Sequence, residues 1–72
     1  MKKEEYKNLY QLHFQNKSNL DETELVAQKT ITSEDEMRDW QNDVAGRHPL
    51  PDGMCWLICN WDSKYFVKAA IK

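Results

Sequence analysis

Apolar and polar side chains alternate along the first third of the chain, which predicts two β-strands. In residues 7–15 one parity is apolar and the other polar, the pattern of a half-buried strand. Asn16, Ser18 and Asn19 then favour a turn, and residues 24–31 repeat the alternation. Lys29 interrupts the apolar side of this second segment, so we expect an edge strand or a bulge there.

A helix is predicted next, because the apolar spacing changes from two residues to three or four. The positions at helical spacing are Met37, Trp40, Gln41 and Val44. Ser33 and Glu36 match a capping box, in which the serine hydroxyl accepts from a backbone N–H three residues on and the glutamate reaches back. The helix should end near residues 46–48, because Pro49 cannot continue it.

Two further strands are predicted over residues 54–61 and 64–71, joined around Asp62 and Ser63. The fold class is therefore α+β with the order ββαββ, a single helix packed on a four-stranded antiparallel sheet. The expected core consists of Tyr10, Leu12, Phe14, Leu25, Ile31, Met37, Trp40, Val44, Trp56, Ile58 and Val67.

The third strand is apolar on both sides, which one helix cannot cover. Trp56 and Ile58 lie on one side, and the opposite side carries Cys55, Leu57, Cys59 and Trp61. This pattern is typical of a strand buried on both faces. Two interpretations remain open: the N-terminal segment closes the second face with Tyr6 and Leu9, or an apolar patch stays exposed for self-association or a protein partner.

Composition indicates one small folded domain spanning residues 1–72. A net charge of −2 is not the basic balance of a typical nucleic-acid-binding protein, and 40% hydrophobic residues are too many for a disordered chain. No apolar run is long enough for a membrane span or a signal peptide, so we expect a cytoplasmic protein with reduced cysteines and no membrane partner. So small a domain gains stability from dimerisation or a partner.

Candidate chemistry is sparse. Cys55 and Cys59 are four apart in a predicted strand, about 13 Å, too far for a disulfide within the chain. Neither these cysteines nor His13 and His48 have the close spacing of a zinc site. No phosphate-binding loop or nucleophile motif is present, so we expect no catalytic residue, no metal and no cofactor.

Two functional hypotheses remain. The first is a non-enzymatic protein-interaction or regulatory module, including a homodimer, that uses the sheet face or an acidic ridge on the helix. Its candidate residues are Leu57, Trp61 and Phe66 on the sheet and Asp35, Asp39 and Asp43 on the helix. The second is a weak single-stranded nucleic-acid-binding domain that uses a basic, aromatic strand face made of Lys64, Phe66, Lys68 and Lys72.

Overall fold

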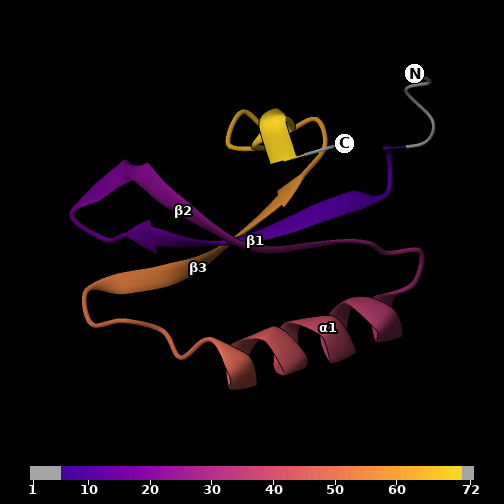
Figure 1. Cartoon of the computed structure of the whole chain (residues 1–72), viewed down its shortest axis with the longest axis horizontal. Coiled ribbons are helices and arrows are strands. Elements are labelled where there is room, and N and C mark those ends of the chain that lie inside the picture. Colours follow the sequence, from indigo (N-terminus) through magenta and orange to yellow (C-terminus); the bar gives the residue numbers. More distant parts are fainter. Residues whose placement is uncertain (1–5, 71–72) are drawn as a thin grey trace.

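The computed structural model describes residues 6–70 and shows an α+β fold with one helix on a three-stranded antiparallel sheet (Figure 1). The elements in chain order are β1 (Leu9–Asn16), β2 (Asn19–Thr30), the helix α1 (Glu34–Arg47), β3 (Met54–Asn60) and the short 3₁₀-helix η2 (Lys68–Ala70). The strand order is β2-β1-β3, so β1 is central. The two predicted N-terminal strands, the helix and the third strand are confirmed.

A tight turn joins β1 to β2 and places β2 at an edge of the sheet. Asn16 Oδ1 accepts from Ser18 N at 2.8 Å, the local side-chain bond that favours such turns. The register shifts between Leu12 and His13, because Leu12 pairs with Ala27 whereas His13 pairs with Leu25. The predicted edge strand is therefore present, and its irregularity falls at Val26 rather than at Lys29.

The capping box sets the start of α1. Ser33 Oγ accepts from Glu36 N at 3.1 Å, and Glu36 Oε1 accepts from Thr32 N at 3.0 Å. The helix ends at Arg47, with His48 N donating to Val44 O at 2.8 Å before Pro49. Both helix boundaries therefore lie where the sequence predicts them.

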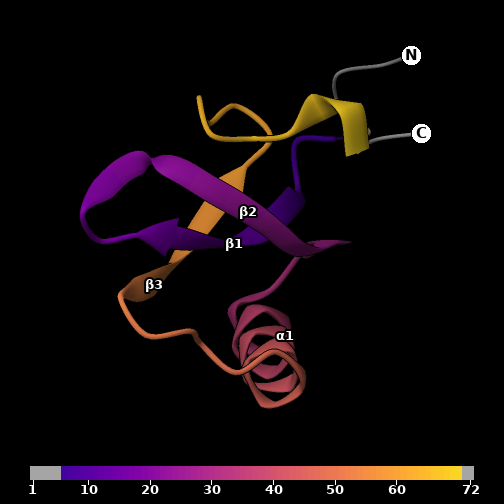
Figure 2. The same ribbon diagram turned by 60° about the vertical axis from the view of Figure 1, so that its left-hand side comes forward.

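The sheet is covered on both faces. One face packs on α1 and holds a core of Leu12, Ile31, Trp40 and Val44. The opposite face holds a smaller cluster of Leu9, Cys59 and Phe66, against which Tyr6, Leu57, Trp61 and Tyr65 pack. Figure 2 shows α1 end-on below the sheet and the C-terminal segment above it. Tyr6, which precedes β1, packs on this face as the first interpretation expects. Leu9 lies in β1 itself, and Tyr65 and Phe66 supply the rest of the cover from the C-terminal side.

The fourth strand expected over residues 64–71 is not formed within residues 64–70, and Ile71 lies outside the described residues. After β3 the chain turns twice, with Ser63 N bonded to Asn60 O at 2.8 Å and Phe66 N to Ser63 O at 3.0 Å. The segment then crosses the second face and ends in η2. The order over the described residues is therefore ββαβ.

Two residues of the expected core are exposed. Ile58 is 45% exposed, because it projects from an edge strand and is not among the side chains that pack on the core beneath α1. Val67 is 37% exposed, because it meets the sheet through its backbone N–H and C=O groups, which bond to Gln11. Leu12, Phe14, Ile31, Trp40 and Val44 are buried as predicted, and Tyr10, Leu25, Met37 and Trp56 are half-buried.

Candidate functional site

The outer edge of β3 is the candidate functional site. In the part of the chain that the structure describes, β3 pairs only with β1, so its other side has no neighbouring strand. A strand that the sequence marks as central, apolar on both faces, is thus found at an edge. It contains no charged residue from Met54 to Asn60. Exposed edges of this kind are the usual templates for pairing with another chain.

Two hydrogen bonds fix which backbone groups of β3 face outward. Trp61 N donates to Leu9 O at 3.1 Å, and Lys17 N donates to Gly53 O at 3.0 Å, so residues 53 and 61 turn their polar groups toward β1. The β1–β3 register has no shift, and backbone direction alternates along a strand, so every odd residue between them does the same. The even residues Met54, Trp56, Ile58 and Asn60 therefore turn their backbone N–H and C=O groups outward.

Part of this outward row is already used by local turns. Met54 N donates to Pro51 O at 3.2 Å, and Asn60 O accepts from Ser63 N at 2.8 Å. Of these outward groups of β3, the ones without a hydrogen-bond partner among residues 6–70 are the Met54 C=O, the Asn60 N–H and both groups of Trp56 and Ile58. An added strand could form hydrogen bonds with these six groups.

The opposite edge of the sheet is built differently. β2 carries Asp21, Glu22, Glu24 and Lys29, and all four are exposed. Charged side chains and a bulge are the devices by which edge strands avoid pairing with other chains. β2 therefore has both protective features, whereas β3 has neither charged side chains nor a bulge.

A polar network centred on the buried side chain of Gln11 holds the C-terminal segment on the second face of the sheet. The Gln11 side chain is fully buried and forms a two-bond pairing with Val67: Val67 N donates to Gln11 Oε1 at 2.9 Å, and Gln11 Nε2 donates to Val67 O at 3.1 Å. Gln11 Nε2 also donates to Gln28 Oε1 at 2.9 Å, and Gln28 Nε2 donates to Ala70 O at 3.2 Å. The segment therefore runs over β1 and β2.

His13 extends this network and is fully buried. Because Gln11 Oε1 accepts from a backbone N–H, the His13 Nε2 that lies 2.8 Å from it must carry a proton and donate. His13 Nδ1 is then an acceptor, and it has no hydrogen-bond partner among residues 6–70. Protonation would place a charged N–H in this buried position, and burial accordingly lowers the pKa of His13 below 6.5.

The sheet-face residues predicted for an interface lie within the second cluster. Phe66 is buried, and Leu57 and Trp61 are half-buried and pack against that cluster. Trp61 stacks edge-on against Phe66, with ring centroids 5.3 Å apart, and Tyr6 lies 5.0 Å from Trp61 on the same basis. These aromatic rings mainly cover one another.

The candidate nucleic-acid face is dispersed by the same packing. Phe66 is not available for stacking, Lys68 Nζ lies 5.1 Å from the centre of the Trp61 ring, and Lys64 Nζ lies 4.9 Å from that of Tyr65. Lys72 lies outside the described residues. Lys64 and Lys68 remain exposed.

The acidic ridge is brought together on the solvent side of α1. Asp35, Asp39 and Asp43 are all exposed at four-residue spacing. Arg38 bonds to Asp35 at 2.9 Å, and Arg47 bonds to Asp43 at 3.2 Å. Such exposed pairs contribute little to stability, and they leave Asp39 as the one member without an arginine partner in residues 6–70.

The cysteines are free thiols on the second face. Cys55 is half-buried, and Cys59 is buried, which raises the pKa of its thiol despite a hydrogen bond with Ser63 that acts the other way. No three His, Cys, Asp or Glu side chains gather as a metal site within residues 6–70.

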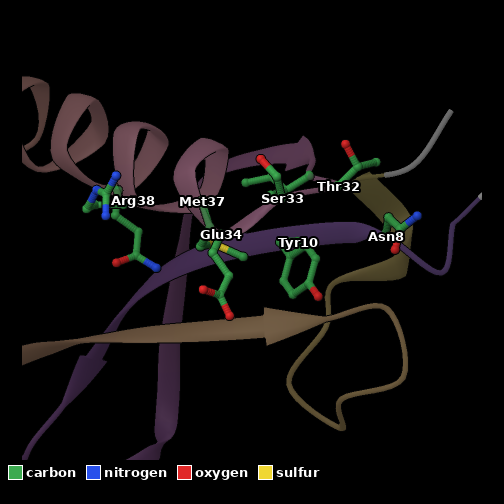
Figure 3. Close-up of a pocket in the computed structure, with 9 residues that line it drawn as sticks. Asn8, Tyr10, Thr32, Ser33, Glu34, Met37 and Arg38 are labelled. Atoms are coloured by element: carbon green, nitrogen blue, oxygen red, sulfur yellow. The ribbon is translucent and has the colours of Figure 1, made fainter.

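An open groove of about 390 Å³ lies between the first turns of α1 and the sheet. Figure 3 shows Glu34, Met37 and Arg38 of α1 with Tyr10 of β1 along it. The charged side chains along the groove are those of Glu34 and Arg38, and both are exposed to solvent.

Comparison of the chain with family models, curated proteins and solved structures finds no match. No helix in the described residues is long and apolar enough to cross a membrane. Sequence reasoning missed Gln11 and Gln28, because polar residues on a strand normally indicate a solvated face. One signal was available: the third strand has apolar residues on the face opposite the helix, so some segment of the chain had to cover that face. Polar residues of the first strand on the same face could then be expected to bond to that segment.

Proposed function

We propose that the protein is a non-enzymatic protein-interaction module whose binding element is the outer edge of β3. The observation that carries this proposal is an uncharged strand, apolar on both faces, that lies at a free edge with its backbone groups unpaired. A peptide or strand added there would gain main-chain hydrogen bonds, and side chains on alternate positions would supply specificity. Ile58, 45% exposed beside this edge, would be covered by the added strand.

A pair of lysine substitutions tests this function. Ile58→Lys places a charge on the β3 edge, whereas Leu20→Lys makes a similar change at a residue of β2 that is 57% exposed. Both side chains are exposed, so both variants should fold, which thermal unfolding checks. Each of the three proteins, wild type, Leu20→Lys and Ile58→Lys, is immobilised and exposed to a cell extract supplemented with a tagged copy of the chain. Wild type and Leu20→Lys should retain the same proteins, and Ile58→Lys should not retain them.

The site of contact is then mapped by amide hydrogen exchange in each purified complex. We expect new protection at Trp56 and Ile58, whose N–H groups face outward. Equal retention by Ile58→Lys, or protection confined to α1, would refute the β3 edge as the binding element and direct attention to Asp35, Asp39 and Asp43.

Single-stranded nucleic-acid binding is a weaker second proposal. Its support is the pair of exposed lysines, Lys64 and Lys68, beside the half-buried rings of Tyr65 and Trp61. Binding through these residues should weaken steeply as salt is raised, because phosphate contacts release counterions. An affinity for a labelled oligonucleotide that Lys64→Gln and Lys68→Gln leave unchanged would reject this role for the segment.

We also propose a cytoplasmic, reducing location. Its support is that both cysteines are free and that Cys59 is buried as a thiol.

A further inference from the structure

We propose that the strand added to β3 is β3 of a second copy of this chain. The two strands are antiparallel, with Leu57 opposite Leu57 of the second copy and the two-fold axis midway between them. This inference rests on the proposed use of the β3 edge and names its occupant and register. It produces a continuous sheet of six strands from two three-stranded halves.

The free backbone groups of the edge are self-complementary in this register. Centring on Leu57 places Trp56 opposite Ile58 of the second copy, and Met54 opposite Asn60. Trp56 and Ile58 have both groups free, so each of these pairs exchanges two bonds, as in an antiparallel ladder. The free Asn60 N–H meets the free Met54 C=O, while the Met54 N–H and Asn60 C=O are already used by Pro51 and Ser63. Every free group therefore finds a partner.

Other registers fit less well. A shift by two residues still brings outward groups together, but it leaves two residues at an end of each strand unpaired and either the Asn60 N–H or the Met54 C=O without a partner. A shift by one residue would set outward groups against inward ones, so no ladder could form.

The side chains agree with the backbone. On the helix face, Trp56 would lie beside Ile58 of the second copy, an aromatic and β-branched pair that stabilises sheets. This pairing covers the exposed side chain of Ile58. On the other face, Cys55 would lie directly opposite Cys59 of the second copy, because both stand two residues from Leu57.

Charge and access also favour a second copy. β3 carries no charge, so pairing with itself brings no like charges together, whereas β2 carries two glutamates and an aspartate along its edge. The C-terminal segment leaves the outer edge open, since Val67 lies over Gln11 of β1 and Ala70 over Gln28 of β2. Figure 2 shows this segment above the sheet, on the side opposite α1.

Complementary cysteine variants test the register. The proposed pairing sets Cys55 against Cys59, and it keeps two copies of the same cysteine four positions apart. Cys55→Ser and Cys59→Ala should therefore not form cross-linked dimers when each is treated alone with the thiol oxidant diamide. Mixed together they should, because one copy supplies Cys59 and the other Cys55. Each disulfide forms with loss of two protons and two electrons, which reduce the diazene to a hydrazine.

Light scattering behind a sizing column supplies the readout that does not depend on thiols. Wild type and Leu20→Lys should approach twice the mass of one chain as concentration rises, and Ile58→Lys should keep the mass of one chain. Thermal unfolding checks that each cysteine variant is folded. No cross-link in the mixture, or cross-links in either variant alone, overturns the register.

The outcomes separate this inference from the function on which it rests. A wild-type protein that stays monomeric to millimolar concentration overturns the second copy as occupant. In that case the β3 edge is still supported as a binding element for another protein if Ile58→Lys abolishes capture of that protein. Dimers that Ile58→Lys does not dissociate overturn the inference as well, because they form through a different surface.

Discussion

Gln11 explains at the residue scale why the C-terminal segment covers the sheet instead of extending it. Its amide presents one donor and one acceptor to the backbone of Val67, as a neighbouring strand would, but from the face of the sheet rather than its edge. Gln28 repeats the contact at Ala70 with one bond. A fully buried amide with its hydrogen-bonding groups satisfied fixes one position for the segment, because any other would leave polar groups buried without partners.

Gln11→Met should therefore destabilise the protein markedly although it keeps the volume of the side chain. The change removes both bonds to Val67 and leaves His13 Nε2 without an acceptor. We expect a loss of about 2–4 kcal/mol in the free energy of unfolding, measured by urea titration. Gln15→Met is the matched control, because the Gln15 amide donates one exposed bond, to Leu20 O, and should cost less than about 1 kcal/mol. Equal losses in the two variants would contradict the network.

His13 should make stability depend on pH. Burial lowers its pKa in the folded protein, so the unfolded chain binds the proton first as pH falls below about 6.5. Stability contributed by neutral His13 is therefore present above pH 6.5 and is lost toward lower pH, with a slope of at most about 1.4 kcal/mol per pH unit. The register partners of His13, Leu25 and Leu57, carry no charge that would offset this.

His13→Gln supplies the control for this pH effect. The substituted amide does not titrate and can still donate to Gln11, so the slope of stability between pH 5 and 7 should be smaller than in wild type. Urea unfolding at several pH values measures both proteins. Identical slopes would show that another group is responsible.

At the element scale, the sequence predicted those elements whose local signals and packing agree. The capping residues and apolar spacing of α1 fixed its start, its end and its buried residues Trp40 and Val44. The alternation of β1 was equally informative about the helix face, where Leu12 and Phe14 are buried.

The last segment could not be predicted in the same way. Its alternating residues have the period of a strand, but its position depends on Gln11 and Gln28, which are 56 and 42 residues distant from their backbone partners. Ile58 was assigned to the core for a related reason. A pattern of apolar residues predicts that a side chain is buried, but it does not predict whether residues of the same chain or of another chain bury it.

The capping box of α1 gives a prediction at this scale. Ser33→Ala removes the acceptor for Glu36 N and should lower the free energy of unfolding by about 1 kcal/mol. Ser33→Asp retains an acceptor at the helix N-terminus and should cost much less. Urea titration compares the two, and a similar loss for both would mean that the cap contributes no specific bond.

At the scale of the whole molecule, the chain completes its cover on both faces of the sheet but not along both edges. α1 closes one face, the C-terminal segment closes the other, and charges guard β2. Among the described residues, the β3 edge combines apolar side chains and free backbone groups with a strand that carries no charge. A chain of 72 residues buries a modest share of its surface, so pairing along this edge would also add stability.

Amide hydrogen exchange of residues 55–59, followed by NMR over a range of protein concentrations, tests the central claim most directly. At low concentration Leu57 and Cys59, bonded to β1, should exchange slowly, while Trp56 and Ile58 should exchange fast. As concentration rises, Trp56 and Ile58 should become protected, because a second β3 then accepts from their N–H groups. Slow exchange of Trp56 and Ile58 at every concentration would show that the edge is already paired within the chain. Fast exchange of both at every concentration, with and without captured partners, would show that this edge pairs with nothing.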